Sequence, residues 1–263
     1  MLTEIINHKY REVEKLKQKY PLPALKERII QLPLPRDFTR ALSDQTRVNV
    51  IAEIKKASPS HGVFDTPFLQ ENTVAQIARK YEGNGASAIS VLTDHKYFSG
   101  SAADLMKTRE AVNIPVLRKD FIISDYQIYE SRAMGADAVL LIVSCLSDDE
   151  LLRFYKLTKE LGMSALVEVG NKEEVERAGR IGAEIIGINN RNLDTMEVDI
   201  NRTLEISPAI PAGTIIVSES GIKNEAQIQK LKAEAGVAAV LVGTRLITEG
   251  ESLLGSLAKQ TKE

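Results

Sequence analysis

From residue 49 onward the chain repeats one pattern of apolar and polar positions. A short aliphatic run is followed by a polar turn with Gly or Ser, and then by an amphipathic stretch. Such alternation is typical of strands that are each followed by a helix. The runs that predict strands are 48–54, 88–92, 115–118, 138–143, 164–169, 185–189, 214–218 and 239–242. The segments that predict helices include 73–82, 102–112, 125–134, 148–161, 172–181 and 225–234.

Eight strand–helix units predict an α/β protein with a (β/α)8 TIM barrel. An open, doubly wound sheet uses the same alternation and differs only in strand order, which the sequence does not reveal. The first predicted strand is not followed by the GxGxxG fingerprint that many doubly wound sheets carry. The pattern therefore favours the barrel.

The segment before residue 48 has a different pattern. Apolar positions at Ile5, Ile6, Val13 and Leu16 predict a first helix, a proline-punctuated link follows, and a second short helix is expected around 38–42. We interpret residues 1–47 as an N-terminal helical extension packed on the barrel and residues 48–263 as the barrel, which together form a single domain.

Composition excludes several classes of protein. The 34 Lys and Arg residues nearly balance the 36 Asp and Glu residues, so the net charge of −2 provides no basic field for nucleic acid or an anionic membrane. Cys145 is the sole cysteine and permits no intrachain disulfide, which suits a reducing compartment. The charged first residues are unlike a signal peptide, and the apolar runs are too short to span a bilayer. We expect a cytoplasmic protein.

Several predicted strands end in ionisable or amide side chains. The strands of a (β/α)8 barrel direct their carboxyl ends to one mouth, where such enzymes place their chemistry. Period-2 alternation puts Ile51, Glu53 and Lys55 on one face of the first strand, although an ion pair with a purely structural role is the alternative for the two charges. The polar side chains at strand ends are Glu53, Lys55, Lys119, Glu168, Asn189, Arg191 and Ser220. Their convergence predicts an active site.

A lysine at such a mouth has two possible chemical roles. Burial near other cations is expected to lower the pKa of Lys119 and to fit it for general acid catalysis near neutral pH. Schiff-base formation is the alternative. His8, His61 and His95 are scattered along the chain and indicate neither a metal cluster nor a catalytic triad.

The last two predicted strands carry a different signal. Ser220-Gly221 follows the seventh and Gly243-Thr244-Arg245 follows the eighth, where barrels commonly bind phosphate through loop N–H groups. Glycine lets the backbone approach phosphate oxygens, and a hydroxyl adds a donor. We expect a phosphorylated small molecule as the ligand.

These segments together resemble the indole-3-glycerol-phosphate synthase family. The motifs that carry the resemblance are 51–60 (IAEIKKASPS), 91–98 (VLTDHKYF), 117–122 (LRKDFI), 187–193 (GINNRNL) and 218–222 (SESGI). The resemblance implies a carbon–carbon lyase of tryptophan biosynthesis. It would convert 1-(2-carboxyphenylamino)-1-deoxyribulose 5-phosphate to indole-3-glycerol phosphate with loss of CO2 and water. It also implies no cofactor, no metal and a monomer.

The resemblance also implies roles for single residues. Lys119 would protonate the ribulose carbonyl oxygen as the new bond forms, and Glu168 would act as general acid or base in the later dehydration. Lys55 would be held by Glu53 beside the carboxylate and phosphate of the substrate. Asn189 and Ser220 would hydrogen-bond the substrate, with Arg191 adding positive charge. Ser58, Gly221, Gly243 and Thr244 would bind the phosphate, and Phe98, Phe121, Leu140, Ile142 and Met196 would form an apolar slot for the aryl ring.

Two alternatives stay open. A phosphoribosylanthranilate isomerase binds a nearly identical ligand, but it would have a cysteine at the end of the first strand, where this chain has Glu53 and Lys55. A non-catalytic barrel that binds a phosphorylated metabolite would have no use for lysines held beside acids in a desolvated mouth. Departures from the family pattern at His61, His95, Asn192 and Met196 affect none of the proposed catalytic groups.

Overall fold

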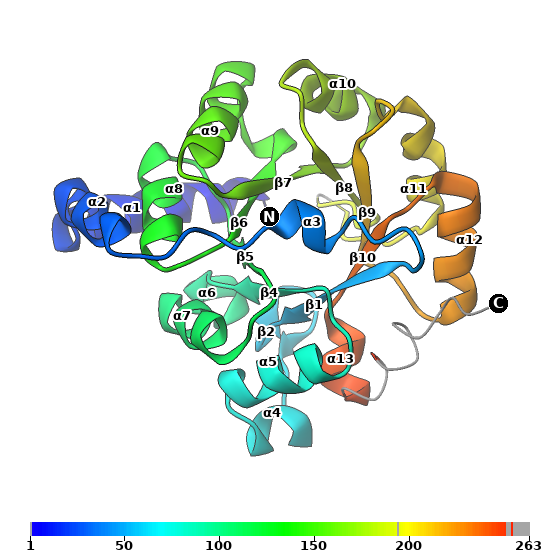
Figure 1. The fold of residues 1–263 in the computed structure, drawn as a ribbon, viewed down its shortest axis with the longest axis horizontal. Coiled ribbons are helices and arrows are strands. Elements are labelled where there is room, and N and C mark those ends of the chain that lie inside the picture. Colours follow the sequence, from blue (N-terminus) through cyan, green and yellow to red (C-terminus); the bar gives the residue numbers. More distant parts are fainter. Residues whose placement is uncertain (1, 194, 251–253, 255–263) are drawn as a thin grey trace.

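A closed barrel of parallel strands forms the centre of the molecule (Figure 1). The computed structural model describes residues 2–193, 195–250 and 254. Residue 1 of the predicted extension and residues 194, 251–253 and 255–263 of the predicted barrel segment therefore lie outside the described residues. The eight barrel strands that the structure describes follow the order β1-β10-β9-β8-β7-β6-β5-β4. They are β1 (Asn49–Ile54), β4 (Ala88–Leu92), β5 (Val116–Lys119), β6 (Ala138–Ile142), β7 (Ser164–Val169), β8 (Ile185–Asn189), β9 (Ile215–Glu219) and β10 (Ala239–Val242). Closure confirms the barrel and excludes the open sheet.

Both faces of the strands are buried, which explains why the strand segments read as nearly continuous apolar runs. Outward side chains such as Val50, Val139 and Val167 pack against the surrounding helices. Inward side chains such as Leu117 and Val217 fill the barrel interior towards the amino ends of the strands, which we call the lower barrel. Towards the carboxyl ends the inward side chains become polar, so the ionisable groups gather at that end of the barrel.

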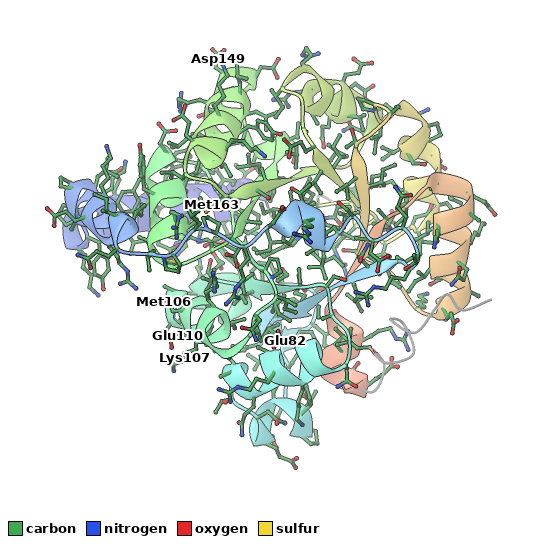
Figure 2. The ribbon with its side chains drawn as sticks, in the orientation of Figure 1. Glu82, Met106, Lys107, Glu110, Asp149 and Met163 are labelled. Carbon is green, nitrogen blue, oxygen red and sulfur yellow. The ribbon has the colours of Figure 1, made fainter. Side chains whose placement is uncertain are left out.

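The helices surround the barrel and confirm the predicted helical segments. They are α4 (Pro67–Glu71), α5 (Val74–Gly83), α6 (His95–Phe98), α7 (Ala102–Ala111), α8 (Asp125–Ala133), α9 (Asp148–Glu160), α10 (Lys172–Arg180), α11 (Asn201–Ile206), α12 (Glu225–Ala235) and α13 (Thr244–Glu249). Figure 2 shows Asp149 at the outer end of α9, whereas Met163 is buried. Among the helices of the described ranges, none is both long and apolar enough to cross a membrane.

Several short elements were not predicted, among them one helix before the barrel and a pair of two-residue strands. The proline-punctuated link contains α2 (Leu22–Ile30), because Pro21 caps this helix and Pro23 lies in its first turn, where the missing N–H costs nothing. A short antiparallel pair, β2 (Ala57–Ser58) and β3 (Gly62–Val63), follows β1. Two residues per strand are too few to show a period-2 pattern.

The residues before β1 contact both ends of the barrel. Phe38 and Leu42, in and after α3 (Phe38–Ala41), are fully buried against the inward side chains of the lower barrel. Helix α1 (Leu2–Lys19) packs beside α8, and in Figure 1 it runs behind the barrel, whereas α3 lies in front. The backbone N–H of Arg36 donates to the Asp137 carboxylate and ties the intervening link to the residue just before β6.

We propose that the extension and the barrel unfold as one domain, and Phe38→Ala tests this. Emptying a fully buried aromatic site removes about 3–5 kcal/mol of unfolding free energy. Leu34→Ala is the matched control, because Leu34 is 86% exposed and its truncation should change stability by less than about 0.5 kcal/mol. Denaturant unfolding followed by circular dichroism and fluorescence should give one shared, destabilised transition for Phe38→Ala. A separate early transition contradicts the proposal.

Candidate active site

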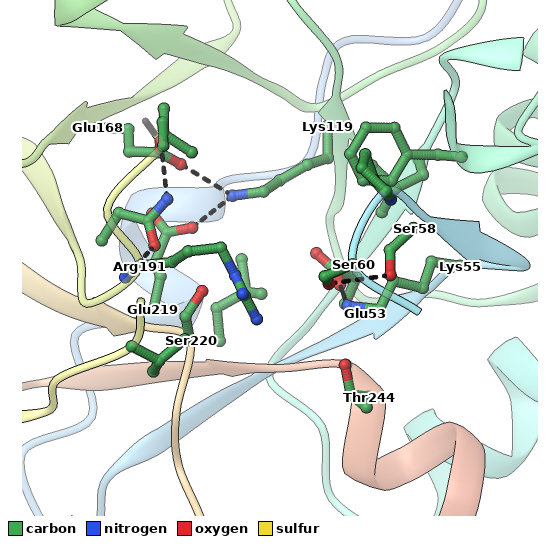
Figure 3. A pocket seen from close by; sticks show the side chains of 18 of the residues that line it. Glu53, Lys55, Ser58, Ser60, Lys119, Glu168, Arg191, Glu219, Ser220 and Thr244 are labelled. Atoms are coloured by element: carbon green, nitrogen blue, oxygen red, sulfur yellow. Dashed lines mark hydrogen bonds and ion pairs between the residues drawn. The ribbon is translucent and has the colours of Figure 1, made fainter. Parts of the chain in front are cut away.

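A cavity of about 400 Å³ opens at the carboxyl ends of the barrel strands. Every residue that the sequence nominated for the site lines this cavity. Figure 3 shows several of them converging from different strands and loops. The cavity has three parts: a charged floor, an apolar slot and a set of polar loops.

The floor is one layer of four side chains across the barrel interior. Glu53, Lys119, Glu168 and Glu219 come from β1, β5, β7 and β9, which are alternate strands in the barrel order. Alternate strands contribute side chains to a common layer in barrels of this type. Lys119 Nζ lies 3.1 Å from Glu168 Oε2 and is also paired with Glu219 Oε2 (Figure 3).

The acids of this layer change the expected electrostatics of Lys119. Burial opposes the charged form, but the Glu219, Glu168 and Glu53 carboxylates outweigh it and raise the pKa of Lys119 above its ordinary value. The prediction of a lowered pKa was therefore wrong for this state of the site. It considered nearby cations, whereas the layer brings three carboxylates closer, and Lys55 is already paired with one of them.

Glu219 is a further candidate that the sequence analysis did not nominate, although it lies in the polar Ser218-Glu219-Ser220 end of the seventh predicted strand. It is 1% exposed, and burial together with the Glu168 carboxylate raises its pKa to about 7 against the opposing effect of Lys119. Gly187 on β8 makes room for it, because a Cβ there would collide with the Glu219 carboxylate. The predicted strand ended at residue 218. Extending the alternation of Val217 by two positions would have placed Glu219 inside the barrel.

Glu53 and Lys55 form a pair beside this layer. Lys55 Nζ lies 2.9 Å from Glu53 Oε1 and 6.0 Å from the centre of the Phe64 ring. Burial opposes ionisation of Glu53, but Lys55 and Lys119 lower its pKa. Gly243 follows β10, the neighbour of β1 in the barrel, and lies against this carboxylate. A Cβ at Gly243 would collide with the Glu53 carboxylate.

Asn189 links Glu168 to the loop after β8. Its Nδ2 donates to Glu168 Oε1 at 3.0 Å, and its Oδ1 accepts from the backbone N–H of Arg191 at 3.0 Å. The Arg191 guanidinium donates to the Met196 carbonyl oxygen at 2.9 Å. Met196 has φ +64°, a left-handed conformation that is strained for a residue with a side chain and often marks functional loops.

The apolar slot lies beside the charged floor. Phe98 at the end of α6 and Phe121 just after β5 have ring centroids 6.3 Å apart. Leu140 and Ile142 from β6 line the same cavity, as does Met196. The structure adds Leu2 and Ile5 of α1 to the lining. The apolar spacing of Ile5 predicted a helix, and nothing local in the sequence connected either residue to the mouth.

The polar loops bring hydroxyls, glycines and two further cations to the cavity. Their lining residues are Ser58, Ser220, Gly221, Gly243, Thr244, Lys223 and Arg245. Gly221 has φ +80°, and a Cβ there would approach Val198 to 2.6 Å, so both backbone conformation and space require glycine. Ser220 is also left-handed, at φ +68°. Hydroxyl and N–H donors with adjacent cations suit an anionic group.

The chain is similar in sequence to known proteins along most of its length. The family model described as indole-3-glycerol phosphate synthase matches residues 2–254. The chain belongs to this family. The indole-3-glycerol phosphate synthase of Chloroherpeton thalassium is 48% identical over 250 residues, covering 94% of this chain and 94% of the relative. That of Endomicrobium trichonymphae is 52% identical over 213 residues, covering 81% and 80%.

Solved structures of lower identity share the fold. Thiamine phosphate pyrophosphorylase from Pyrococcus furiosus superposes with a TM-score of 0.56 at 15% identity, covering 82% of this chain and 95% of that chain. The N-acetylmannosamine-6-phosphate 2-epimerase from Clostridium perfringens superposes with a TM-score of 0.56 at 13% identity, covering 81% of this chain and 91% of that chain.

The family match confirms the resemblance and the expected carboxy-lyase of tryptophan biosynthesis.

Gly243→Ala tests whether the Glu53–Lys55 pair depends on space at Gly243. The added methyl displaces the Glu53 carboxylate, so indole-3-glycerol phosphate formation should fall about 100-fold, the typical cost of misplacing an active-site group. Gly83→Ala is the matched control, since nothing lies within 4 Å of the added carbon, and it should retain activity. Full activity in steady-state assays of Gly243→Ala contradicts the steric argument.

Proposed function

We propose that this chain performs the family's ring closure with Lys119 as general acid and Glu168 as general acid or base. The substrate is 1-(2-carboxyphenylamino)-1-deoxyribulose 5-phosphate. The observation that carries the proposal is the position of Lys119, which lines one cavity with the apolar slot and the polar loops and is surrounded by three acids. An aryl ring in the slot and a phosphate at the loops would span this floor.

Ring closure needs a proton at the carbonyl oxygen of the ribulose chain. The aryl carbon that bears the carboxylate attacks the carbonyl carbon, and the electron pair of the C=O bond moves to oxygen. Lys119, kept protonated by its acidic neighbours, donates a proton there and forms a hydroxyl group. Loss of CO2 then returns an electron pair to the ring and restores its aromaticity.

Dehydration completes the indole. The new hydroxyl leaves as water after protonation, and the adjacent carbon loses a proton to form the ring double bond. Glu168 suits this proton transfer because Lys119 and Asn189 hold its two oxygens at 3.1 and 3.0 Å. The reaction consumes one proton overall, because a carboxylate leaves as CO2, and this proton enters from solvent. The proton taken from the adjacent carbon is passed on through the Glu168–Lys119 pair, so the catalytic groups return to their starting state.

The remaining lining residues position the substrate in this proposal. Ser58, Gly221, Gly243 and Thr244 bind the phosphate, and Lys55 and Arg191 offset the substrate's negative charge. Phe98 and Phe121, with the aliphatic slot residues, hold the aryl ring over the carbonyl carbon. Such positioning is worth several kcal/mol of the barrier.

Lys119→Ala should lower kcat by about 10²- to 10⁴-fold, the usual contribution of a general acid. Product affinity, followed by the fluorescence of the indole product, should stay measurable. Lys119→Arg keeps the charge among the three acids but cannot release a proton, so it should bind product without turnover. Lys56→Ala is the matched control, because Lys56 pairs with Asp104 away from the cavity. Wild-type turnover in Lys119→Ala refutes the assignment.

Glu219→Gln tests the titration of the floor near neutral pH. An anionic ligand raises the pKa of Glu219 further above about 7, so binding favours its protonated form. Product affinity of the wild type should therefore weaken, relative to that of Glu219→Gln, as pH rises above 7. Taking the ratio of the two dissociation constants at each pH cancels the titration of the product's own phosphate. A ratio that does not change with pH contradicts this prediction.

We also propose that the protein acts as a monomer in the cytoplasm, without cofactor, metal or nucleic acid. Cys145 has a pKa raised to about 12 by burial and by Glu168, which suits an inert thiol in a reducing compartment. A phosphoribosylanthranilate isomerase is not supported, because β1 leads to Glu53 and Lys55 without a cysteine.

A further inference from the structure

Lys9 of α1 is a buried lysine that the proposed reaction does not use. Its side chain is 2% exposed, and its Nζ lies 2.8 Å from Asp94 Oδ2, 2.9 Å from Asp120 Oδ1 and 2.8 Å from Glu12 Oε2. Asp94 and Asp120 follow β4 and β5 and are themselves buried. One ammonium group of the extension therefore joins two loops at the barrel mouth.

The same two aspartates hold the backbone of the aryl slot. Asp94 Oδ1 accepts from the backbone N–H of Tyr97 at 2.8 Å and caps α6, the helix that ends at Phe98. Asp120 Oδ1 accepts from the backbone N–H of Phe121 at 2.8 Å. Lys9 thus contacts the group that positions each of the two phenylalanines.

Charge balance makes this lysine necessary. Arg118 is the other cation beside Asp120, at 3.1 Å, but its second nitrogen pairs with Glu130 at 2.8 Å. Without Lys9, Asp94 and Asp120 would be two buried carboxylates with too little positive charge between them. Buried groups in this situation take up protons or move apart.

Lys9 also orients the face of α1 that reaches the cavity. Ile5 lies four residues and Leu2 seven residues before Lys9, so all three share one helix face. Leu2 and Ile5 line the cavity. The far end of α1 is tied separately, because the Tyr126 hydroxyl donates to the carbonyl oxygens of Leu16 and Tyr20.

We propose that Lys9 is a positioning residue for recognition of the aryl ring. Through Asp94 and Asp120 it sets Phe98 and Phe121, and through α1 it seats Leu2 and Ile5 at the same slot. The inference rests on the proposed function in assigning the aryl ring to this slot. It predicts that loss of Lys9 weakens the aryl part of the ligand and leaves the phosphate part unaffected.

The test compares two ligands on Lys9→Met, Lys9→Arg and Lys17→Met. Lys17 is the matched control, an exposed lysine of the same helix paired with Glu14. The dissociation constant of indole-3-glycerol phosphate should rise about 10-fold or more in Lys9→Met, the loss expected from disturbing apolar contacts of one or two side chains. The inhibition constant of glycerol 3-phosphate, which lacks the ring, should stay within about twofold. Lys9→Arg should recover part of the loss, and KM should change more than kcat.

Two results overturn the inference. In the first, Lys9→Met binds both ligands as tightly as the wild type does. In the second, Lys9→Met loses the same factor of affinity for both ligands, which indicates general destabilisation of the protein. If Lys9→Met does not fold, the double variant Lys9→Met/Asp94→Asn replaces it, because it also removes the negative charge of Asp94 that Lys9 would have balanced. Its affinities for the two ligands are measured in the same way. Absence of product formation by the wild type would reject the proposed function instead, so the two failures are distinguishable.

Discussion

The structure depends on one constraint, the burial of four charged side chains in a single layer of a closed barrel. An ammonium group and three carboxylates occupy positions that a purely structural barrel would fill with branched aliphatic residues. The Lys119 ammonium stabilises the carboxylates and they stabilise it, and removing one partner of a buried pair typically costs about 3–5 kcal/mol. Stability is given up here for chemistry, as is common at active sites.

Much of the surrounding design serves this layer. Gly187 and Gly243 keep space for the Glu219 and Glu53 carboxylates. Asn189 occupies the second oxygen of Glu168, and Lys55 engages Glu53. These neighbours leave the Lys119 ammonium held by acids and facing a cavity, which is the state a proton donor needs before the substrate arrives.

The sequence predicted the barrel and the gathering of polar strand-end residues at its mouth, because both follow from local rules, whereas the slot residues were named from the family resemblance. Period-2 alternation identifies inward positions, and the carboxyl ends of parallel strands meet at one mouth. Glu219 was not nominated because the predicted strand ended at residue 218, whereas β9 continues to Glu219. The raised pKa of Lys119 was not predicted, because it depends on which side chains lie in the same layer of the barrel. The stagger between neighbouring strands sets these layers, and the sequence does not reveal it. The positions of Lys9, Leu2 and Ile5 at the barrel mouth were not predicted, because the residues around them there are far away in sequence.

The extension that contacts both ends of the barrel also constrains the order in which the molecule can assemble. Residues 2–47 leave the ribosome before any barrel strand, yet their partners include Asp120, Asp137 and Ser164. The apolar face of α1 and the Phe38 ring therefore stay uncovered until most of the barrel exists. Contacts between residues so far apart in sequence slow folding, and they leave aggregation-prone apolar surface exposed in folding intermediates. During translation, the apolar surface of this segment is therefore exposed until its barrel partners have been synthesised.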